Sequence, residues 1–147
     1  MTNDYQILLA QTLRFLGIRP RSSQEILKYL HSKTRDSVLI DRLTGKLTQS
    51  KLIDDAEFTR WYVESRSRSR PRGARLLVQE LKSKGITYNP QLTTDNEVEL
   101  ARLALASKQK SWSRLTAKDR RPKAIRFLQS RGFSWGTIER TLKKEYN

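Results

Sequence analysis

Residues 66–86 read RSRSRPRGARLLVQELKSKGI. The first ten of these residues include five arginines and no acidic residue. The part that follows places apolar side chains at Leu77, Val78 and Leu81, which is the i, i+1, i+4 spacing of one helical face. Gly85 then suits the left-handed conformation that ends many helices. The stretch therefore predicts a cationic entry that leads into a short amphipathic helix with a defined end.

The arginines precede this helix at the end where cations are unfavourable. A helix N-terminus carries partial positive charge and normally attracts Asp or Glu. A bound anion, held by free backbone N–H groups and arginines together, would explain the placement. The alternative is a solvated basic turn without a ligand. We predict an anion-binding site formed by Arg66, Arg68, Arg70, Arg72 and Arg75, together with Lys82 and Lys84.

The composition points to an acidic partner. The chain has 147 residues, with 30 Lys and Arg against 15 Asp and Glu, and a formal charge of +15 that favours nucleic acid binding. Without cysteine it has no disulfide, zinc-thiolate site or thiol nucleophile. No apolar run approaches the ~20 residues of a membrane span, and residues 1–4 do not begin like a secretory signal. We expect a cytoplasmic protein that does not bind a membrane.

Apolar periodicity predicts an all-α chain with short connections, which the low number of Gly and Pro residues also favours. Helices are expected over 5–16, ended by Gly17, and over 95–110. Residues 87–94 contain Pro90 and predict a loop or a short, poor helix. The expected inward side chains are Ile7, Leu8, Leu9, Leu13, Leu16, Ile26, Leu27, Leu30, Val38, Leu39, Leu43, Leu47, Phe58, Trp61, Tyr62, Ser65, Val98, Leu100, Ala101, Leu105, Ala124, Ile125, Leu128, Trp135, Ile138 and Leu142.

Helix starts are predicted by residues whose side chains accept from backbone N–H groups. Ser22 and Glu25 have the spacing of a capping box, in which each side chain bonds the other residue's backbone. The same spacing occurs at Thr116 and Asp119. The remaining predicted caps are Asp36 or Ser37, Asp54, and Ser134.

An internal repeat relates three helices of the chain. Residues 26–33, 77–84 and 124–131 align at offsets of 51 and 47, with a shared Leu-x-Ser-basic ending. Extending the first alignment backwards places Arg19-Pro20-Arg21 on Arg70-Pro71-Arg72. Chance similarity between amphipathic helices is the alternative explanation.

A period near 50 residues with three helices in each unit predicts an elongated array. The predicted repeats are 1–53, 54–94 and 95–147. If they stack by a similar operation, the basic helix entrances would form a stripe. That stripe would add Arg19, Arg21, Arg120, Arg121 and Lys123 to the binding site.

The chain resembles the RecX family of bacterial recombination regulators, in the order and spacing of its motifs over nearly the whole length. The residues that carry the resemblance are Arg19-Pro20-x-Ser22-x-x-Glu25, Leu52-Ile53-Asp54-Asp55 with Phe58 and Tyr62-Val63, Gly73, Glu80-Leu81-x-x-Lys84-Gly85-Ile86, and Gly132-Phe133-Ser134 with Ile138. Two departures are Thr34, where the other two repeats have Gly, and Pro90 in the third helix of the middle repeat.

The resemblance implies a curved array of three tandem three-helix units that acts as a monomer without a cofactor. It implies binding to the RecA filament on single-stranded DNA, with inhibition of the RecA ATPase and of strand exchange. The associated processes are homologous recombination, DNA repair and the SOS response. Bare single-stranded DNA is expected to bind weakly, and duplex DNA binding stays open. Whether such a protein caps or strips filaments also stays open.

Nothing in the sequence indicates an enzyme. Asp54 and Asp55 point about 100° apart on a helix, so they suit capping better than acid–base catalysis. His31 is the only histidine and predicts neither a zinc site nor a catalytic triad. Among the aromatic residues, Trp61 and Tyr62 suit a core, whereas Trp112 lies in a polar stretch and is the candidate for base stacking.

Two other interpretations would also account for the basic residues. A general nucleic-acid-binding helical protein would act without RecA and would hold bare DNA tightly. A disordered Arg-Ser tail at 65–70 fused to an unrelated bundle is disfavoured, because the run is short and leads directly into a patterned helix.

Overall fold

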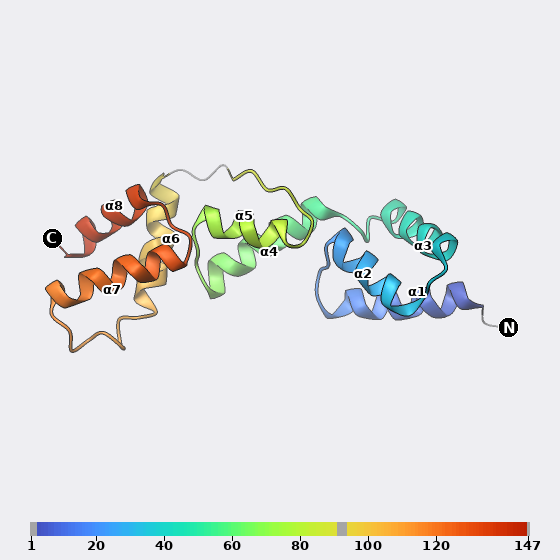
Figure 1. Ribbon diagram of the computed structural model, residues 1–147, viewed down its shortest axis with the longest axis horizontal. Helices are drawn as coiled ribbons and strands as arrows, with labels where there is room; N and C mark the ends of the chain where they lie inside the picture. The colour runs from blue at the N-terminus through green and yellow to red at the C-terminus, as the bar shows by residue number, and fades with distance from the viewer. Residues whose placement is uncertain (1–2, 91–93, 147) are drawn as a thin grey trace. The chain divides into compact units, whose positions relative to one another are not determined.

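The computed structural model describes residues 3–90 and 94–146 (Figure 1). All regular secondary structure in these two ranges is α-helical, which confirms the predicted all-α class. The helices are α1 (Asp4–Ile18), α2 (Ser23–Lys33), α3 (Ser37–Gln49), α4 (Asp55–Ser69), α5 (Ala74–Lys82), α6 (Thr94–Ala106), α7 (Ala117–Ser130) and α8 (Trp135–Tyr146).

Predicted caps begin five of these helices, α2, α3, α4, α7 and α8. Ser22 Oγ accepts from the Glu25 N–H (3.2 Å), and the Glu25 carboxylate accepts from the Ser22 N–H (3.0 Å), so the capping box at α2 is complete. Asp36, rather than Ser37, caps α3 through the N–H groups of Val38 and Leu39. Asp54, Thr116 and Ser134 accept from the first turns of α4, α7 and α8.

The helix ends divide into two kinds. Gly85 and Gly132 follow α5 and α7 with φ of +81° and +83°, the left-handed conformation that glycine adopts most easily. Thr34 ends α2 with extended backbone (φ −152°), which needs no glycine and explains the departure from the repeat. The prediction that Gly17 ends the first helix is wrong by one residue, because α1 continues to Ile18 and Arg19 is the extended cap.

The chain divides into two compact units. The N-terminal unit comprises Met1–Tyr62 with Ser83–Ile86, and the C-terminal unit comprises Val63–Lys82 with Thr87–Asn147. The boundary falls inside α4.

In the N-terminal unit α1, α2 and α3 pack against one another in pairs (Figure 1). Four predicted inward residues are corrected, because Ile7, Leu13, Leu27 and Val38 are 45%, 43%, 36% and 74% exposed. Thr12 is buried instead, one helical turn after Leu8, and its hydroxyl donates to the Leu8 carbonyl (2.7 Å). The buried apolar side chains are Leu8, Ile26, Leu30, Ile40, Leu43, Leu47 and Ile53.

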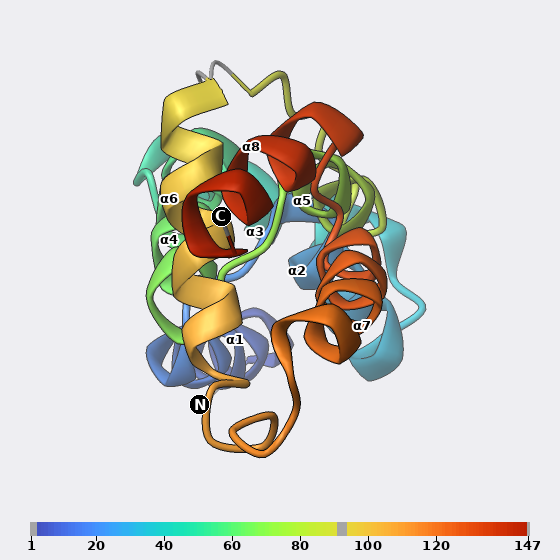
Figure 2. The same ribbon diagram turned by 90° about the vertical axis from the view of Figure 1, so that its left-hand side faces the viewer.

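In the C-terminal unit α6, α7 and α8 enclose a second core (Figures 1 and 2). α6 ends at Ala106, four residues before the predicted Lys110, and residues 107–115 continue mostly as turns. Trp135, which was expected to face inward, is 55% exposed at the start of α8. The buried apolar side chains are Ala101, Ala104, Leu105, Ala124, Leu128, Phe133, Ile138 and Leu142.

The apolar stripe predicted from the opening stretch is present in α5. Leu77 and Leu81 are buried, and Val78 is half-buried beside them. After the helix, residues 87–90 have no regular secondary structure, as the Pro90 signal predicted. Of the rest of the predicted loop, residues 91–93 lie outside the described residues, and Thr94 is the first residue of α6.

Candidate nucleic-acid interface

The predicted basic stretch covers the end of α4, a connector and the start of α5. Arg66 and Arg68 lie in the last turn of α4, where cations complement the negative helix terminus. Arg70 and Arg72 lie in the connector, and Arg75 lies in the first turn of α5. Arg68, Arg70 and Arg75 are exposed, whereas Arg66 and Arg72 are half-buried. The stretch therefore mixes solvent-facing cations with cations that the fold already uses.

The α5 N-terminus has an anion of the protein itself. The Ala74 N–H donates to Glu97 Oε1 (2.8 Å), and Thr137 Oγ1 donates to Glu97 Oε2 (3.0 Å). Glu97 belongs to α6, 23 residues away in sequence from Ala74, and is only 9% exposed. The sequence analysis missed this residue and assigned the N–H groups to an external anion. That assignment is corrected for the Ala74 N–H, which is bound by Glu97. The Glu97 contact does not explain why the arginine side chains gather here.

The N-terminal unit contains the equivalent contact. The Ser23 N–H donates to Asp55 Oδ1 (2.8 Å), and Ser23 Oγ donates to Asp55 Oδ2 (2.8 Å). Ser23 and Ala74 are 51 residues apart, which is the repeat offset. In both units a carboxylate from the first turn of a later helix caps the second helix of a repeat. Acidic residues soon after a predicted helix start were the available sequence signal for these caps.

Two glycines hold the connector before α5 against the end of α7. The Gly73 N–H donates to the Arg131 carbonyl (2.7 Å). A Cβ on Gly73 would lie 2.2 Å from the Gly132 carbonyl oxygen, and one on Gly132 would lie 2.4 Å from Leu76 Cβ. Neither position has room for a side chain. This backbone approach brings Arg131, which the sequence analysis did not select, beside the connector.

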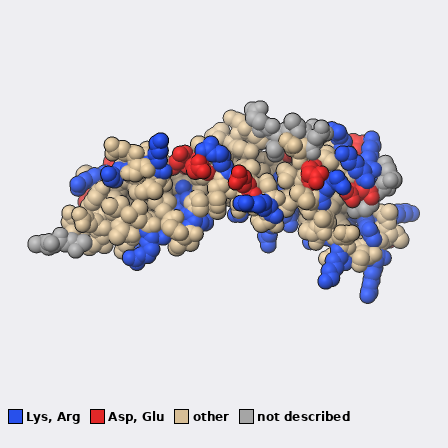
Figure 3. Space-filling view, turned by 180° about the vertical axis from the view of Figure 1, so that it is seen from behind, with Lys and Arg blue, Asp and Glu red and all other residues tan. Residues whose placement is uncertain are grey.

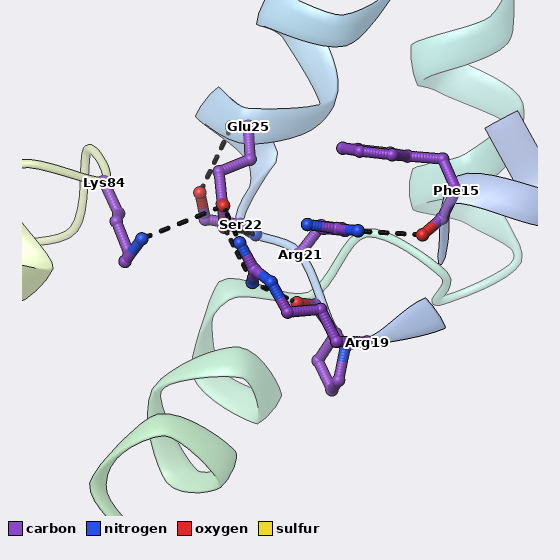
Figure 4. A network of polar contacts seen from close by, with 7 residues as sticks. Phe15, Arg19, Arg21, Ser22, Glu25 and Lys84 are labelled. Atoms are coloured by element: carbon purple, nitrogen blue, oxygen red, sulfur yellow. Dashed lines mark hydrogen bonds and ion pairs between the residues drawn. The ribbon is translucent and has the colours of Figure 1, made fainter. Parts of the chain in front are cut away.

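Four residues of the N-terminal unit form what we call the Glu25 cluster: Arg19, Arg21, Glu25 and Lys84 (Figure 4). Arg19 forms an ion pair with Glu25, and Lys84 Nζ lies 3.8 Å from the same carboxylate. The Arg21 guanidinium stacks on the Phe15 ring (3.9 Å) and donates through Nε to the Phe15 carbonyl (3.3 Å). One carboxylate therefore sits between the cations of the cluster.

The surroundings of Glu25 favour its charged form. Burial opposes ionisation, but it is outweighed by hydrogen bonds from Arg19 and the Ser22 N–H and by the charges of Arg19 and Lys84. These contacts lower the pKa of the Glu25 carboxyl below its ordinary 4.5. Burial also lowers the pKa of the Arg21 guanidinium, aided by the charge of Arg19 and opposed by that of Glu25.

Four residues of the C-terminal unit form what we call the Arg131 cluster: Arg70, Arg72, Leu76 and Arg131. Arg72 Nη1 pairs with Glu80 (2.6 Å), and Arg72 Nε donates to the Arg70 carbonyl (2.9 Å). The Arg131 guanidinium lies over the Phe127 ring (4.9 Å). Burial lowers the pKa of Arg131, and the charges of Arg72 and Arg70 lower it further. The charges of Arg70 and Arg72 thus both act on the Arg131 guanidinium.

The basic residues of the third repeat are placed differently from the prediction. α7 begins at Ala117, so Arg120, Arg121 and Lys123 lie inside the helix rather than at its entrance. Arg121 and Lys123 are exposed. Arg120 Nη2 donates to the Ser113 carbonyl (3.0 Å), while its buried Nε has no hydrogen-bond partner among the described residues.

Trp112 is half-buried rather than freely exposed. Its ring meets Phe127 edge-to-face, with centroids 6.0 Å apart, and packs against the C-terminal core. It also lines a groove of about 630 Å³ beside Arg120. Tyr62 is buried and Trp61 half-buried against Phe58, in agreement with their expected place in a core.

Lys and Arg side chains project from the C-terminal unit, seen at the right of Figure 3. Lys82, one of the predicted contact residues, is exposed at the end of α5. The described part of the chain holds no group of three or more His, Cys, Asp and Glu residues able to bind a metal. Among the helices described, none is long and apolar enough to cross a membrane.

These features define a basic, all-helical repeat protein. Residues 54–87 match the family model for the second three-helix domain of RecX, and residues 95–142 match the model for the third. The chain belongs to the RecX family.

Individual relatives give the same result. A regulatory protein RecX from Pelodictyon phaeoclathratiforme is 31% identical over 89% of this chain and 84% of its own. One from Chlorobium phaeobacteroides is 34% identical over 88% and 87%. The crystal structure of RecX from Lactobacillus salivarius has the same fold, with a TM-score of 0.77 at 22% identity over 97% of this chain and 96% of that one. The relatives' name supports a regulatory role.

Proposed function

We propose that this protein binds the RecA filament on single-stranded DNA and inhibits the RecA ATPase and strand exchange, and thereby modulates recombination and repair. The observation that carries the proposal is membership of the RecX family through relatives that match most of the chain. The charge of +15 and the exposed arginines of the opening stretch supply attraction to a filament that contains DNA phosphates.

We further propose that the chain acts as a monomer of three repeats, 1–53, 54–94 and 95–147. The stretches matched to the second and third RecX domains fall inside the last two of these ranges and support the division. Within the binding surface we include the exposed cations Arg68, Arg70, Arg75, Lys82, Arg121 and Lys123.

The test is ATP hydrolysis by RecA on single-stranded DNA, with this protein titrated below the RecA concentration. Binding to the same DNA without RecA is measured in the same buffer. Inhibition at substoichiometric protein, at a salt concentration that abolishes binding to bare DNA, is the expected result. Inhibition only at concentrations that coat the DNA would contradict the proposal and favour a general nucleic-acid binder.

A pair of charge-reversal variants localises the surface. Arg75→Glu reverses an exposed cation of the opening stretch, and Arg35→Glu reverses an exposed cation outside it. We expect Arg75→Glu to require several-fold more protein for half-maximal inhibition than Arg35→Glu. Equal inhibition curves would remove Arg75 from the surface.

A further inference from the structure

The two clusters occupy equivalent positions of the repeat. The offset of 51 relates Arg19 and Arg21 to Arg70 and Arg72, and the offset of 47 relates Lys84 to Arg131. Each cluster therefore has three cations in matching places. The offset of 51 also relates Glu25 to Leu76. The carboxylate at the centre of the Glu25 cluster is thus replaced by an apolar side chain in the Arg131 cluster.

The replacement leaves two of the three cations of the Arg131 cluster without a carboxylate in contact in the described part of the chain. Glu80 pairs with Arg72, but neither Arg70 nor Arg131 has a carboxylate partner among the described residues. The Arg72 guanidinium uses Nε and Nη1, so its Nη2 keeps N–H donors available. Like charges gathered in a partly buried place repel one another, and a bound anion relieves that repulsion.

The Arg131 cluster is also held in position before any ligand binds. The Gly73 N–H···Arg131 carbonyl bond (2.7 Å) fixes the connector to the end of α7. The Phe127 ring supports the Arg131 guanidinium, and Glu80 orients Arg72. Pre-oriented guanidinium groups bind phosphate oxygens with charge-assisted, often paired hydrogen bonds.

We propose that Arg70, Arg72 and Arg131 together bind one backbone phosphate of single-stranded DNA, in the position that the Glu25 carboxylate fills in the equivalent cluster. In the Glu25 cluster that position is already filled by the carboxylate shared between Arg19 and Lys84, so we expect no such contact there. This inference rests on the proposed function, because it takes the DNA of the filament as the source of the phosphate. It assigns a specific contact within a surface otherwise defined by charge alone.

The test restores the missing carboxylate. Leu76→Glu carries the residue found at the equivalent position, and Leu76→Gln is the uncharged control of similar size. Binding of a fluorescent oligothymidylate is measured by anisotropy over a salt series. We expect Leu76→Glu to bind several-fold more weakly and to reduce the steepness of the log–log salt dependence by about 0.7, the value for one phosphate on a single strand. Leu76→Gln should keep the wild-type slope.

A second pair covers the case in which neither Leu76 variant folds. Arg70→Gln removes one exposed cation of the cluster, and Arg35→Gln removes one exposed cation elsewhere. Arg70→Gln should make the log–log salt dependence of oligothymidylate binding less steep, and Arg35→Gln should leave it unchanged. Equal slopes within either folded pair would overturn the inference.

RecA inhibition by the same variants separates this inference from the proposed function. One outcome is that the cluster variants change the salt dependence of DNA binding while the wild-type protein does not inhibit RecA. That outcome would support the phosphate site and contradict the proposed function. Weaker RecA inhibition by Leu76→Glu, with unchanged binding to bare DNA, would overturn the phosphate site. The cluster would then meet carboxylates of RecA, and the proposed function would stand.

Discussion

The Glu25 and Arg131 clusters occupy equivalent positions of the repeat and contain three cations each, but a carboxylate contacts two cations in the first cluster and one cation in the second. Each lies beside the start of the second helix of a repeat, which a carboxylate from a later helix caps. In the first cluster Glu25 holds Arg19 and Lys84, whereas in the second Leu76 stands in its place. With the proposed phosphate site, the residue at this one position of the repeat would decide whether the neighbouring cations contact a carboxylate of the fold or an external anion.

The largest expected effect tests whether the two helices beside the clusters are equivalent in packing. Leu30 and Leu81 are 51 residues apart, and both are fully buried. Truncation of either to Ala should reduce the free energy of unfolding by about 2–5 kcal/mol, the range for buried leucines. Urea denaturation followed by circular dichroism measures both. A loss within about 0.5 kcal/mol, typical of surface positions, would contradict the repeat packing.

The backbone approach that positions Arg131 is the next target. Gly132→Ala combines a φ of +83° with a Cβ 2.4 Å from Leu76 Cβ, and should cost about 1–3 kcal/mol. Gly136→Ala is the control, because its Cβ would meet nothing within 4 Å in helix α8. It should be neutral or stabilising by up to about 1 kcal/mol. Equal thermal stability of the two variants would show that the approach is not tight.

Glu25 should make the stability of the N-terminal unit depend on pH. Its pKa is lower in the folded protein than in the unfolded chain, so its contribution is present above about pH 5 and is lost as pH falls through the folded pKa. Glu25→Gln should lower the free energy of unfolding by about 1–2 kcal/mol near neutrality. On acidification, the free energy of unfolding of this variant should fall by less than that of the wild type. Glu64→Gln, at an exposed position, is the control. Its free energy of unfolding should change between about pH 6 and pH 3 by as much as that of the wild type.

The smallest effects concern the remaining ion pairs. The side chains of Arg72 and Glu80 are 12% and 22% exposed, whereas those of Arg60 and Glu57 are 66% and 70% exposed. Arg72→Gln should therefore destabilise by about 1 kcal/mol, and Arg60→Gln should destabilise by less, because solvent screens its exposed ion pair. Chemical denaturation distinguishes them. Equal losses would mean that Arg72 is not structurally engaged and is as available for binding as Arg70.

The helices and their starts were predictable because their causes are local. Ser22, Asp54 and Thr116 accept hydrogen bonds from N–H groups no more than three residues away. Leu77 and Leu81 follow the helical period, and Gly85 follows the helix that they stabilise. The all-α class and the repeat offsets follow from the same short-range patterns.

The wrong predictions of buried residues occurred in helices that carry apolar side chains on more than one face. Ile7, Leu13 and Val38 are apolar and periodic, yet the neighbouring helices bury Thr12 and Ile40 instead. Periodicity identifies a face only to within about one residue, because successive helical positions are about 100° apart. Contacts between helices then choose which residues are buried.

The helices, most of their caps, the basic stretch and the family resemblance could be predicted without the structure. Which cations have a carboxylate partner became visible in the folded chain alone. Glu97 reaches Ala74 from 23 residues away, and Gly73 meets Arg131 through a backbone hydrogen bond between distant segments. Charge can be counted along a chain, but its compensation depends on distance and burial. Arg131 therefore became a candidate contact only once folding placed it beside Arg70 and Arg72.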